Sequence, residues 1–170
     1  MYESKIIQGL SRNRELIRCL LEDCGNETVL WKPEPARWCL LEIICHLYDE
    51  EREDFRKRVL HVLDTPDLPL SPINPEGWIT EHEYLRRNFN EVLGFFLEER
   101  SESVRRLNKL ENPDWSKAIN HMDLGRVSAG SFLVNWLAHD FQHIQQIVRL
   151  KYDYLKNETG ESLEYAGKIF

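Results

Sequence analysis

The sequence predicts one all-α domain over residues 1–170, a four-helix bundle with a long crossover loop between the second and third helices. Three observations support this prediction. Four long segments carry apolar residues at helical spacing, with charged residues between them. Proline-containing breaks at residues 31–38 and 64–78 interrupt that pattern, and proline is excluded from helix interiors. No pair of strands with typical hairpin turn residues is found, so no sheet is expected.

The first half of the chain is expected to form two helices. Gly25-Asn26 is a typical end for the first helix. Residues 31–38 (WKPEPARW) contain two prolines and are expected to form a loop. The second helix begins with what resembles a capping box, in which Cys39 replaces the usual Ser and Glu42 holds the third position. The apolar positions are Ile6, Ile7, Leu10, Ile17, Leu20, Leu21 and Cys24 in the first helix, and Leu40, Ile43, Ile44, Leu47, Phe55 and Val59 in the second.

The second half begins with an irregular connection. Residues 64–78 contain four prolines and one glycine, and a loop of this length in a compact domain suggests a crossover or functional role. Thr80 and Glu83 match a capping box that predicts the start of the third helix, and Asn112-Pro113 ends it. A second loop runs to about Gly130, before the last long helix. The apolar positions are Tyr84, Phe89, Val92, Leu93, Phe96, Leu97, Val104 and Leu107, then Phe132, Leu133, Trp136, Leu137, Ile144, Ile147, Val148 and Leu150.

Composition excludes several classes of protein. The net charge is −7 and no basic block occurs, so no nucleic-acid partner is expected, because affinity for phosphates comes largely from Lys and Arg. The amino terminus lacks the apolar run of a signal peptide, and no stretch approaches the roughly 18 apolar residues of a membrane helix. Without an export signal or a Cys-x-x-Cys spacing, free thiols in a reducing cytoplasm are expected. The cysteines are Cys19, Cys24, Cys39 and Cys45.

Two imidazoles fall on the inward stripe of the last helix. That stripe consists of Phe132, Trp136, His139, His143, Ile147 and Leu150. His139 and His143 therefore replace core residues one helical turn apart. A single core histidine usually finds an ordinary hydrogen-bond partner. Two stacked imidazoles need either several partners or a metal, since each has a donor and a lone pair to satisfy. His61, His82 and His121 are expected to be solvated.

His46 is the third candidate ligand, because it lies on the inward stripe of the second helix. Three neutral imidazoles with an open position are typical of a catalytic metal centre, here formed by His46, His139 and His143. Nitrogen ligands suit Zn, Ni, Cu or Fe(II), and a carboxylate from Glu50 would favour iron or manganese. Cys45 points about 100° away from His46 on the helix and is expected to be a core thiol.

Acidic residues accompany the predicted ligands. A carboxylate on the far nitrogen of a metal-bound histidine fixes its tautomer, so Asp49, Glu50 and Asp140 are candidates for this supporting role. The alternative is that these acids only form a solvated helix face. Glu51 and Glu53 are expected on that solvated face.

Two motifs include the candidate ligands. They are Trp38-x-x-x-Glu42-x-x-x-His46-Leu47-x-Asp49, and His139-x-x-x-His143-x-x-Gln146-Ile147 with Gly125 and Leu133 before it. Both motifs resemble those of the DinB/YfiT-like superfamily of metalloenzymes. The resemblance covers nearly the whole chain. It implies a bundle with an up-up-down-down type connection and one divalent metal ion, with His46, His139 and His143 as the ligands. Cys39 stands where Ser is common, and Asp140-Phe141-Gln142 lacks the usual basic character, which leaves the substrate open.

The resemblance also implies an activity, the transfer of a low-molecular-weight thiol such as mycothiol or bacillithiol to a small electrophilic substrate. A divalent ion holds a thiol as the attacking thiolate and acts as a Lewis acid. Trp78 or Trp115 would hold the electrophile or serve the core. The alternative is a non-catalytic stress-response bundle that binds a metal or a small molecule. A di-iron centre is not expected, since it needs Glu-x-x-His on two helices. The resemblance and the aromatic residues of the loops favour a homodimer.

Overall fold

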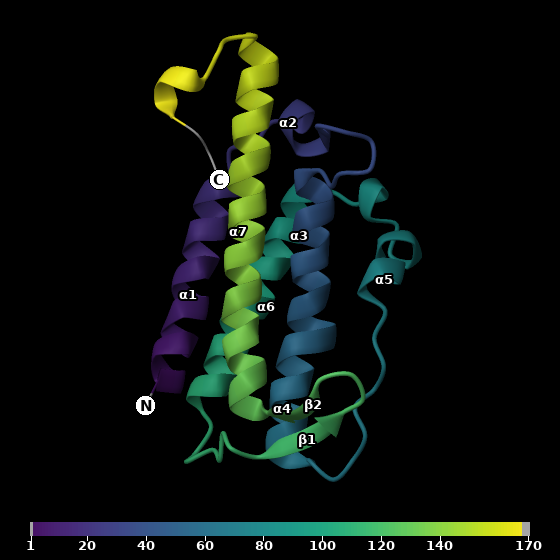
Figure 1. Cartoon of the computed structure of the whole chain (residues 1–170), viewed down its shortest axis with the longest axis vertical. Helices are drawn as coiled ribbons and strands as arrows, with labels where there is room; N and C mark the ends of the chain where they lie inside the picture. Colours follow the sequence, from purple (N-terminus) through teal and green to yellow (C-terminus); the bar gives the residue numbers. More distant parts are fainter. Residues whose placement is uncertain (1, 168–170) are drawn as a thin grey trace.

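The structure, a computed structural model, describes residues 2–167 and consists mainly of four long helical units (Figure 1). The all-α bundle is confirmed. The long units are α1 (Tyr2–Leu21), the continuous α3 (Leu40–Asp49), η1 (Glu50–Phe55) and α4 (Arg56–Asp64), then α6 (Phe89–Asn108) and α7 (Ala129–Thr159). The short elements are α2 (Asn26–Leu30), α5 (Pro75–Glu81), and the 3-10 turns η2 (Tyr84–Arg86) and η3 (Glu164–Ala166). Among these described elements, no helix is both long and apolar enough to cross a membrane.

The long units run up, down, down and up in Figure 1, in the order α1, α3–α4, α6 and α7. The up-up-down-down connection that the resemblance implied is therefore wrong. Two contacts show the parallel pairing of the first and last helices, since Asn13 bonds Asp140 and Lys151 bonds the Leu20 carbonyl. The long connection after α4 runs along one side of the bundle and returns the chain to the top, so that α4 and α6 run in the same direction. It is the predicted crossover loop.

The second helical unit contains a π-helical segment that the sequence pattern did not predict. The capping box at its start is confirmed, because the Cys39 amide donates to Glu42 Oε2 over 2.9 Å. Farther along the unit, the helix widens into π geometry over the six residues Glu50–Phe55. A π turn shifts the phase of the residues around it, so that Glu50 and the adjacent Glu51 are both buried. The expectation that Glu51 lies on a solvated face is therefore wrong.

The third long helix begins later than predicted. Thr80 lies inside the short helix α5, which starts at the Asn74 cap with Pro75 in its first turn. Glu83 adopts a left-handed conformation with φ of 46°, which no helix interior allows. The helix α6 instead begins after Asn88, whose side chain accepts a hydrogen bond from the Glu91 amide over 3.1 Å. The Thr80–Glu83 pattern thus coincides with the end of one short helix rather than the start of a long one.

Replacing Asn88 with alanine is expected to lower the free energy of unfolding by about 1 kcal/mol, the usual cost of losing an N-cap side chain. The matched Thr80→Ala change should have a smaller effect, since Thr80 lies within α5 and caps no helix start. Urea denaturation followed by circular dichroism compares the two variants. A larger loss for Thr80→Ala than for Asn88→Ala would contradict this assignment of the helix start.

A two-stranded hairpin, β1 (Ala118–His121) and β2 (Gly125–Ser128), lies between α6 and α7. The expectation of no sheet is wrong at this point. Ile119 pairs with Val127, and both side chains are buried against the end of the bundle. The connecting residues Met-Asp-Leu lack the Asn-Gly or Asp-Gly signal of a tight hairpin, and only Gly125, with φ of 68°, marks the turn.

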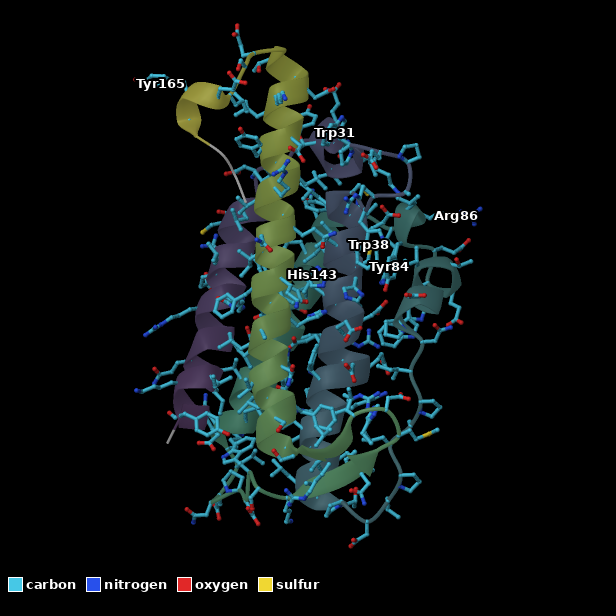
Figure 2. All side chains as sticks on the ribbon, in the orientation of Figure 1. Trp31, Trp38, Tyr84, Arg86, His143 and Tyr165 are labelled. Atoms are coloured by element: carbon cyan, nitrogen blue, oxygen red, sulfur yellow. The ribbon has the colours of Figure 1, made fainter. Side chains whose placement is uncertain are left out.

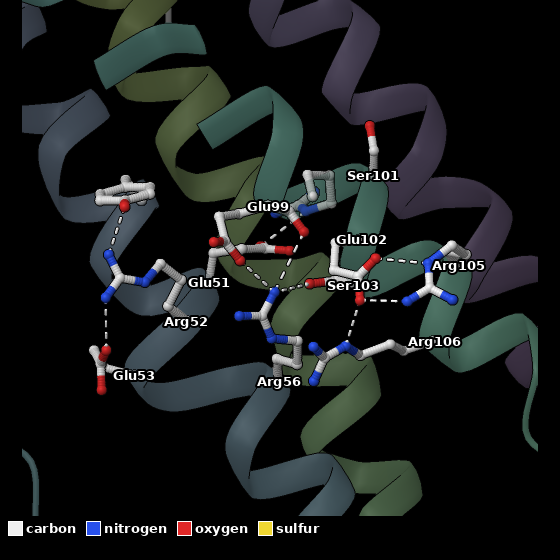
Figure 3. Close-up of polar contacts among 12 residues, drawn as sticks. Glu51, Arg52, Glu53, Arg56, Glu99, Ser101, Glu102, Ser103, Arg105 and Arg106 are labelled. Carbon is white, nitrogen blue, oxygen red and sulfur yellow. Dashed lines mark hydrogen bonds and ion pairs between the residues drawn. The ribbon is translucent and has the colours of Figure 1, made fainter. Parts of the chain in front are cut away.

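The core has an apolar cluster toward each end of the bundle and a polar layer between them. One cluster contains Ile17, Leu47, Phe96 and Ile147, and the other contains Leu10, Phe55, Leu107 and Trp136. Between the two apolar clusters, each long helical unit contributes one or more buried or half-buried polar residues. These residues are Asn13, Glu50, Glu51, Arg100, Ser103, His139, Asp140 and His143. Arg56 of α4 extends this layer, since it bonds Glu99 and Ser103 of α6 over 2.5 and 3.2 Å (Figure 3). Two of the candidate metal ligands, His139 and His143, belong to this polar layer, and His46 contacts His139 from the second helical unit.

Candidate metal centre

The structure brings His46, His139 and His143 together. His139 Nε2 lies 3.2 Å from His46 Nε2 and 3.1 Å from His143 Nε2. One ring nitrogen from each residue falls within a cluster in which all separations are at most 4.8 Å. The second helical unit supplies His46, and α7 supplies the other two from consecutive turns. Figure 2 shows His143 on α7 and Trp38 just before α3.

This arrangement fits a divalent cation better than hydrogen bonds among the rings. Each ring nitrogen carries at most one hydrogen, so His139 Nε2 cannot satisfy both neighbours as donor and acceptor at once. Three nitrogens at 2.0–2.1 Å from a tetrahedral metal ion would lie about 3.3 Å apart. The separations of His139 Nε2 from His46 Nε2 and His143 Nε2, 3.2 and 3.1 Å, are close to that value. The donor set is therefore suited to one Zn, Ni or Fe(II) ion.

All three imidazoles are neutral at neutral pH, which is the form that binds a metal. Burial, together with repulsion from His143, lowers the pKa of His46 to about 3. Burial likewise lowers the pKa values of His139 and His143. Protonation of His46 and His139 therefore does not compete with metal binding until the solution is strongly acidic.

The outer nitrogens of two ligands differ in their partners. Gln146 Oε1 lies 2.9 Å from His143 Nδ1, so that this nitrogen donates to the amide and the lone pair of Nε2 faces the other imidazoles. His46 Nδ1 is buried without a hydrogen-bond partner among residues 2–167. The ring of His46 is held by aromatic packing instead, since the Trp38 ring meets it edge-on at 4.9 Å. Phe55 contacts His139 at 5.0 Å, which gives the centre an apolar surround.

Glu50 is the acidic residue closest to the three imidazoles. Its Oε1 lies 3.9 Å from His46 Nε2, and its side chain is 8% exposed. Burial, reinforced by repulsion from Asp54, raises the pKa of Glu50 to about 8. A carboxyl group with such a pKa exchanges protons near neutrality, which suits a general acid or base.

The family assignment agrees with this geometry. The sequence profile of the DinB superfamily matches residues 10–147. The chain belongs to the DinB superfamily. Among solved structures it is similar to YfiT from Bacillus subtilis, described as a probable metal-dependent hydrolase with an unusual four-helix bundle topology, at 17% identity and a TM-score of 0.77. The match covers 94% of this chain and 89% of YfiT, and it shows a shared fold. A comparison with curated proteins gave no match.

Asp49 occupies a different place in this DinB fold from the one predicted. Its Oδ2 accepts a hydrogen bond from Tyr84 Oη over 2.8 Å and lies 2.7 Å from His82 Nδ1. Asp49 thus fixes the crossover segment to α3 and does not orient His46. His82 reaches the surface as expected, with 37% of its side chain exposed, but it is bonded to a buried carboxylate. Trp78 is stacked on the His82 ring at 6.2 Å.

Asp140 also has a structural partner. Arg100 donates to both of its carboxylate oxygens, over 2.6 and 2.8 Å, and Asn13 donates to Oδ2. The Arg100 Nε donates to Glu51 over 2.8 Å, and the Trp136 indole donates to the same carboxylate. This buried network joins all four long helices beside the metal centre. Asp140, one of the candidates for supporting a metal-bound histidine, instead bonds Arg100 and Asn13 through its carboxylate oxygens.

The remaining candidates lie outside the centre. Trp115 packs against the apolar cluster that contains Leu10 and Trp136, and Trp78 is stacked on His82. The tryptophan that lies beside the imidazoles is Trp38. His61 bonds the Leu68 carbonyl over 2.9 Å. Cys45 is a fully buried core thiol, as predicted, and burial raises its pKa to about 12.

Replacing Glu50 with glutamine is expected to stabilise the metal-free protein at pH 8 by about 2–4 kcal/mol. The folded pKa of Glu50 is raised above its ordinary value of 4.5 to about 8. The folded state thus binds more protons than the unfolded state between these values, and stability falls as pH rises through this window. Glutamine does not ionise, so it removes the free-energy cost of a buried carboxylate. The gain in the free energy of unfolding should therefore be near zero at pH 4.5 and largest at pH 8. Urea denaturation at both pH values measures it, and an equal gain at each would contradict the shifted pKa.

Proposed function

We propose that this protein is a divalent-metal-dependent enzyme that transfers a low-molecular-weight thiol to a small electrophilic molecule. The observation that carries the proposal is the convergence of three neutral imidazoles beside a buried carboxyl group, Glu50. Three protein ligands leave a coordination position for a reactant, in contrast to a closed structural site. The apolar surround formed by Trp38 and Phe55 strengthens electrostatic interactions within the site.

The residues of the chain have separate roles in this reaction. His46, His139 and His143 would hold the cation, and Gln146 keeps His143 in the required tautomer. The bound cation would supply Lewis acidity and stabilise the anionic form of a thiol. Glu50 accepts the thiol proton at Oε1 and later returns it to the leaving group. The sulfur forms the new S–C bond, and the leaving group departs with the electron pair of the bond that breaks.

Hydrolysis is the second candidate. YfiT, with the same fold, is described as a probable metal-dependent hydrolase. Glu50 would serve equally as the proton acceptor for water, because its pKa of about 8 lies near neutrality. The two reactions differ only in the nucleophile, so the dependence of the rate on added thiol separates them.

The test uses protein reconstituted with Zn²⁺, Ni²⁺ or Fe²⁺ and its His143→Ala variant. Glutathione, cysteine and bacillithiol are each mixed with 1-chloro-2,4-dinitrobenzene, and the thioether product is followed by absorbance. Metal-dependent conjugation that is lost in the variant supports thiol transfer. Metal-dependent hydrolysis of 4-nitrophenyl acetate without thiol supports the second candidate. Equal background rates in both proteins, with metal verified bound to the wild type, would contradict both and favour a non-catalytic binding bundle.

A further inference from the structure

Trp38 is the aromatic residue at the solvent-reached edge of the candidate metal centre. Its ring meets the His46 ring edge-on at 4.9 Å and lies parallel to the His143 ring, with 5° between the planes and 6.3 Å between the centroids. Trp38, His139 and His143 are half-buried, whereas His46 and Glu50 are buried. Solvent and reactants therefore reach the imidazoles from the side on which Trp38 lies.

The loop that carries Trp38 is anchored at both of its ends. At its start, Trp31 packs edge-on against Tyr154 of α7 at 5.5 Å, and Lys32 binds the buried Glu42 carboxylate over 2.7 Å. At its end, the same carboxylate closes the capping box of α3. Figure 2 shows Trp31 farther along α7 than Trp38 and His143. The indole is thus held in place before a ligand arrives, so little loss of loop freedom opposes binding.

The face of an indole ring suits one class of ligand. Aromatic rings are electron-rich on their faces, and indole is the side chain whose face attracts positive charge most strongly. It therefore stacks favourably on an electron-poor ring or conjugated system. Many carbon atoms that thiols attack are made electron-poor by a conjugated nitro or carbonyl group, and conjugation keeps such molecules planar. Saturated molecules offer no planar face to stack.

We infer that Trp38 binds the electrophile of the proposed reaction by stacking, and that it selects planar, electron-poor molecules over saturated molecules of the same size. The inference rests on the proposed function for the role of this ligand as a substrate. The binding step itself needs only the half-buried indole face beside the imidazoles. Trp38 would thus be the specificity-determining residue of the centre.

A nuclear magnetic resonance titration of the full chain, reconstituted with Zn²⁺, tests the binding step without turnover. Nitrobenzene and nitrocyclohexane carry the same nitro group on a planar and a puckered six-membered ring. Nitrobenzene should shift the indole N–H signal of Trp38 and bind about two- to tenfold more tightly than nitrocyclohexane. The signal of Trp115, half-buried outside the centre, should stay unchanged. Equal affinities for the two probes, or an unmoved Trp38 signal, would overturn the inference.

Two variants of Trp38 separate stacking from a structural role. Trp38→Phe keeps an aromatic face and should retain most of the preference for nitrobenzene, whereas Trp38→Leu should remove it. The matched Trp115→Leu change should leave the preference intact. Unchanged circular dichroism and a Zn²⁺ affinity within about twofold of the wild type establish that the Trp38→Leu centre is intact. A Trp38→Leu variant that still prefers nitrobenzene would contradict the inference.

Steady-state kinetics distinguishes this inference from the proposed function. In Trp38→Leu, the KM for 1-chloro-2,4-dinitrobenzene should rise about two- to tenfold, while the rate with iodoacetamide, whose reacting carbon is saturated, should not change. Nitrobenzene binding at Trp38 without any thiol conjugation would support the inference and contradict thiol transfer. Metal-dependent conjugation with an unchanged KM in Trp38→Leu would contradict the inference alone.

Discussion

Replacing His139 with alanine is expected to lower the affinity for a divalent cation by more than the roughly 100-fold that loss of an outer hydrogen bond costs. His139 is the imidazole closest to both others, since its Nε2 lies 3.2 Å from that of His46 and 3.1 Å from that of His143. Without His139, the ring nitrogens of His46 and His143, which lie on different helices, remain to bind the cation. The helix itself should persist, because alanine is the best helix former. Competition with a chromophoric chelator measures the affinity, and circular dichroism measures the helix content.

His121→Ala is the matched control for this experiment. His121 lies in the hairpin, and its Nδ1 accepts a hydrogen bond from the backbone amide of Asp123. Its removal should leave the affinity within a factor of about two. An affinity of His139→Ala equal to that of the control, with the same metal stoichiometry, would show that the three imidazoles do not form the site.

Replacing Arg100 with methionine is expected to destabilise the protein by about 3–5 kcal/mol, the typical cost of breaking a buried ion pair from one side. Arg100 is 1% exposed and donates to two buried carboxylates, Asp140 and Glu51. Without the guanidinium, both carboxylates remain in the core with no cation to compensate them. Urea denaturation of the metal-free protein measures the loss of stability.

Two further variants test whether the stability lost in Arg100→Met comes from the two carboxylates left without a cation. Arg105→Met removes a guanidinium that pairs with Glu102 on the exposed face of the same helix, and it should have little effect. Combining Arg100→Met with Glu51→Gln and Asp140→Asn removes the stranded charges and should recover part of the loss. An Arg100→Met variant within about 1 kcal/mol of the wild type would contradict the role of the network.

The helices and the three candidate ligands could be predicted from the sequence, because both depend on the helical period. His46, His139 and His143 each replace an apolar residue on an inward stripe, and that position was the informative signal. The partners of Asp49 could not be found in this way. Tyr84 and His82 reach Asp49 across the crossover segment, whose path depends on tertiary contacts rather than on a period.

Only part of the buried Arg100 network can be found from the helical pattern of the sequence. Arg100 interrupts the apolar stripe of α6 between Phe96 and Leu107, so its inward position was visible in the pattern. Glu51 was not visible, because a regular α-helix does not predict that both it and Glu50 are buried. The π-helical segment changes the phase at that point, and π turns carry no simple sequence signal.

We propose that His46, His139 and His143 together hold one divalent cation. Anomalous diffraction at the zinc edge from crystals grown with Zn²⁺ tests it most directly. The expected result is a single strong peak per chain, about 2.0–2.1 Å from the Nε2 atoms of all three residues. No peak among these imidazoles, or a peak bound only by other side chains, would contradict the claim.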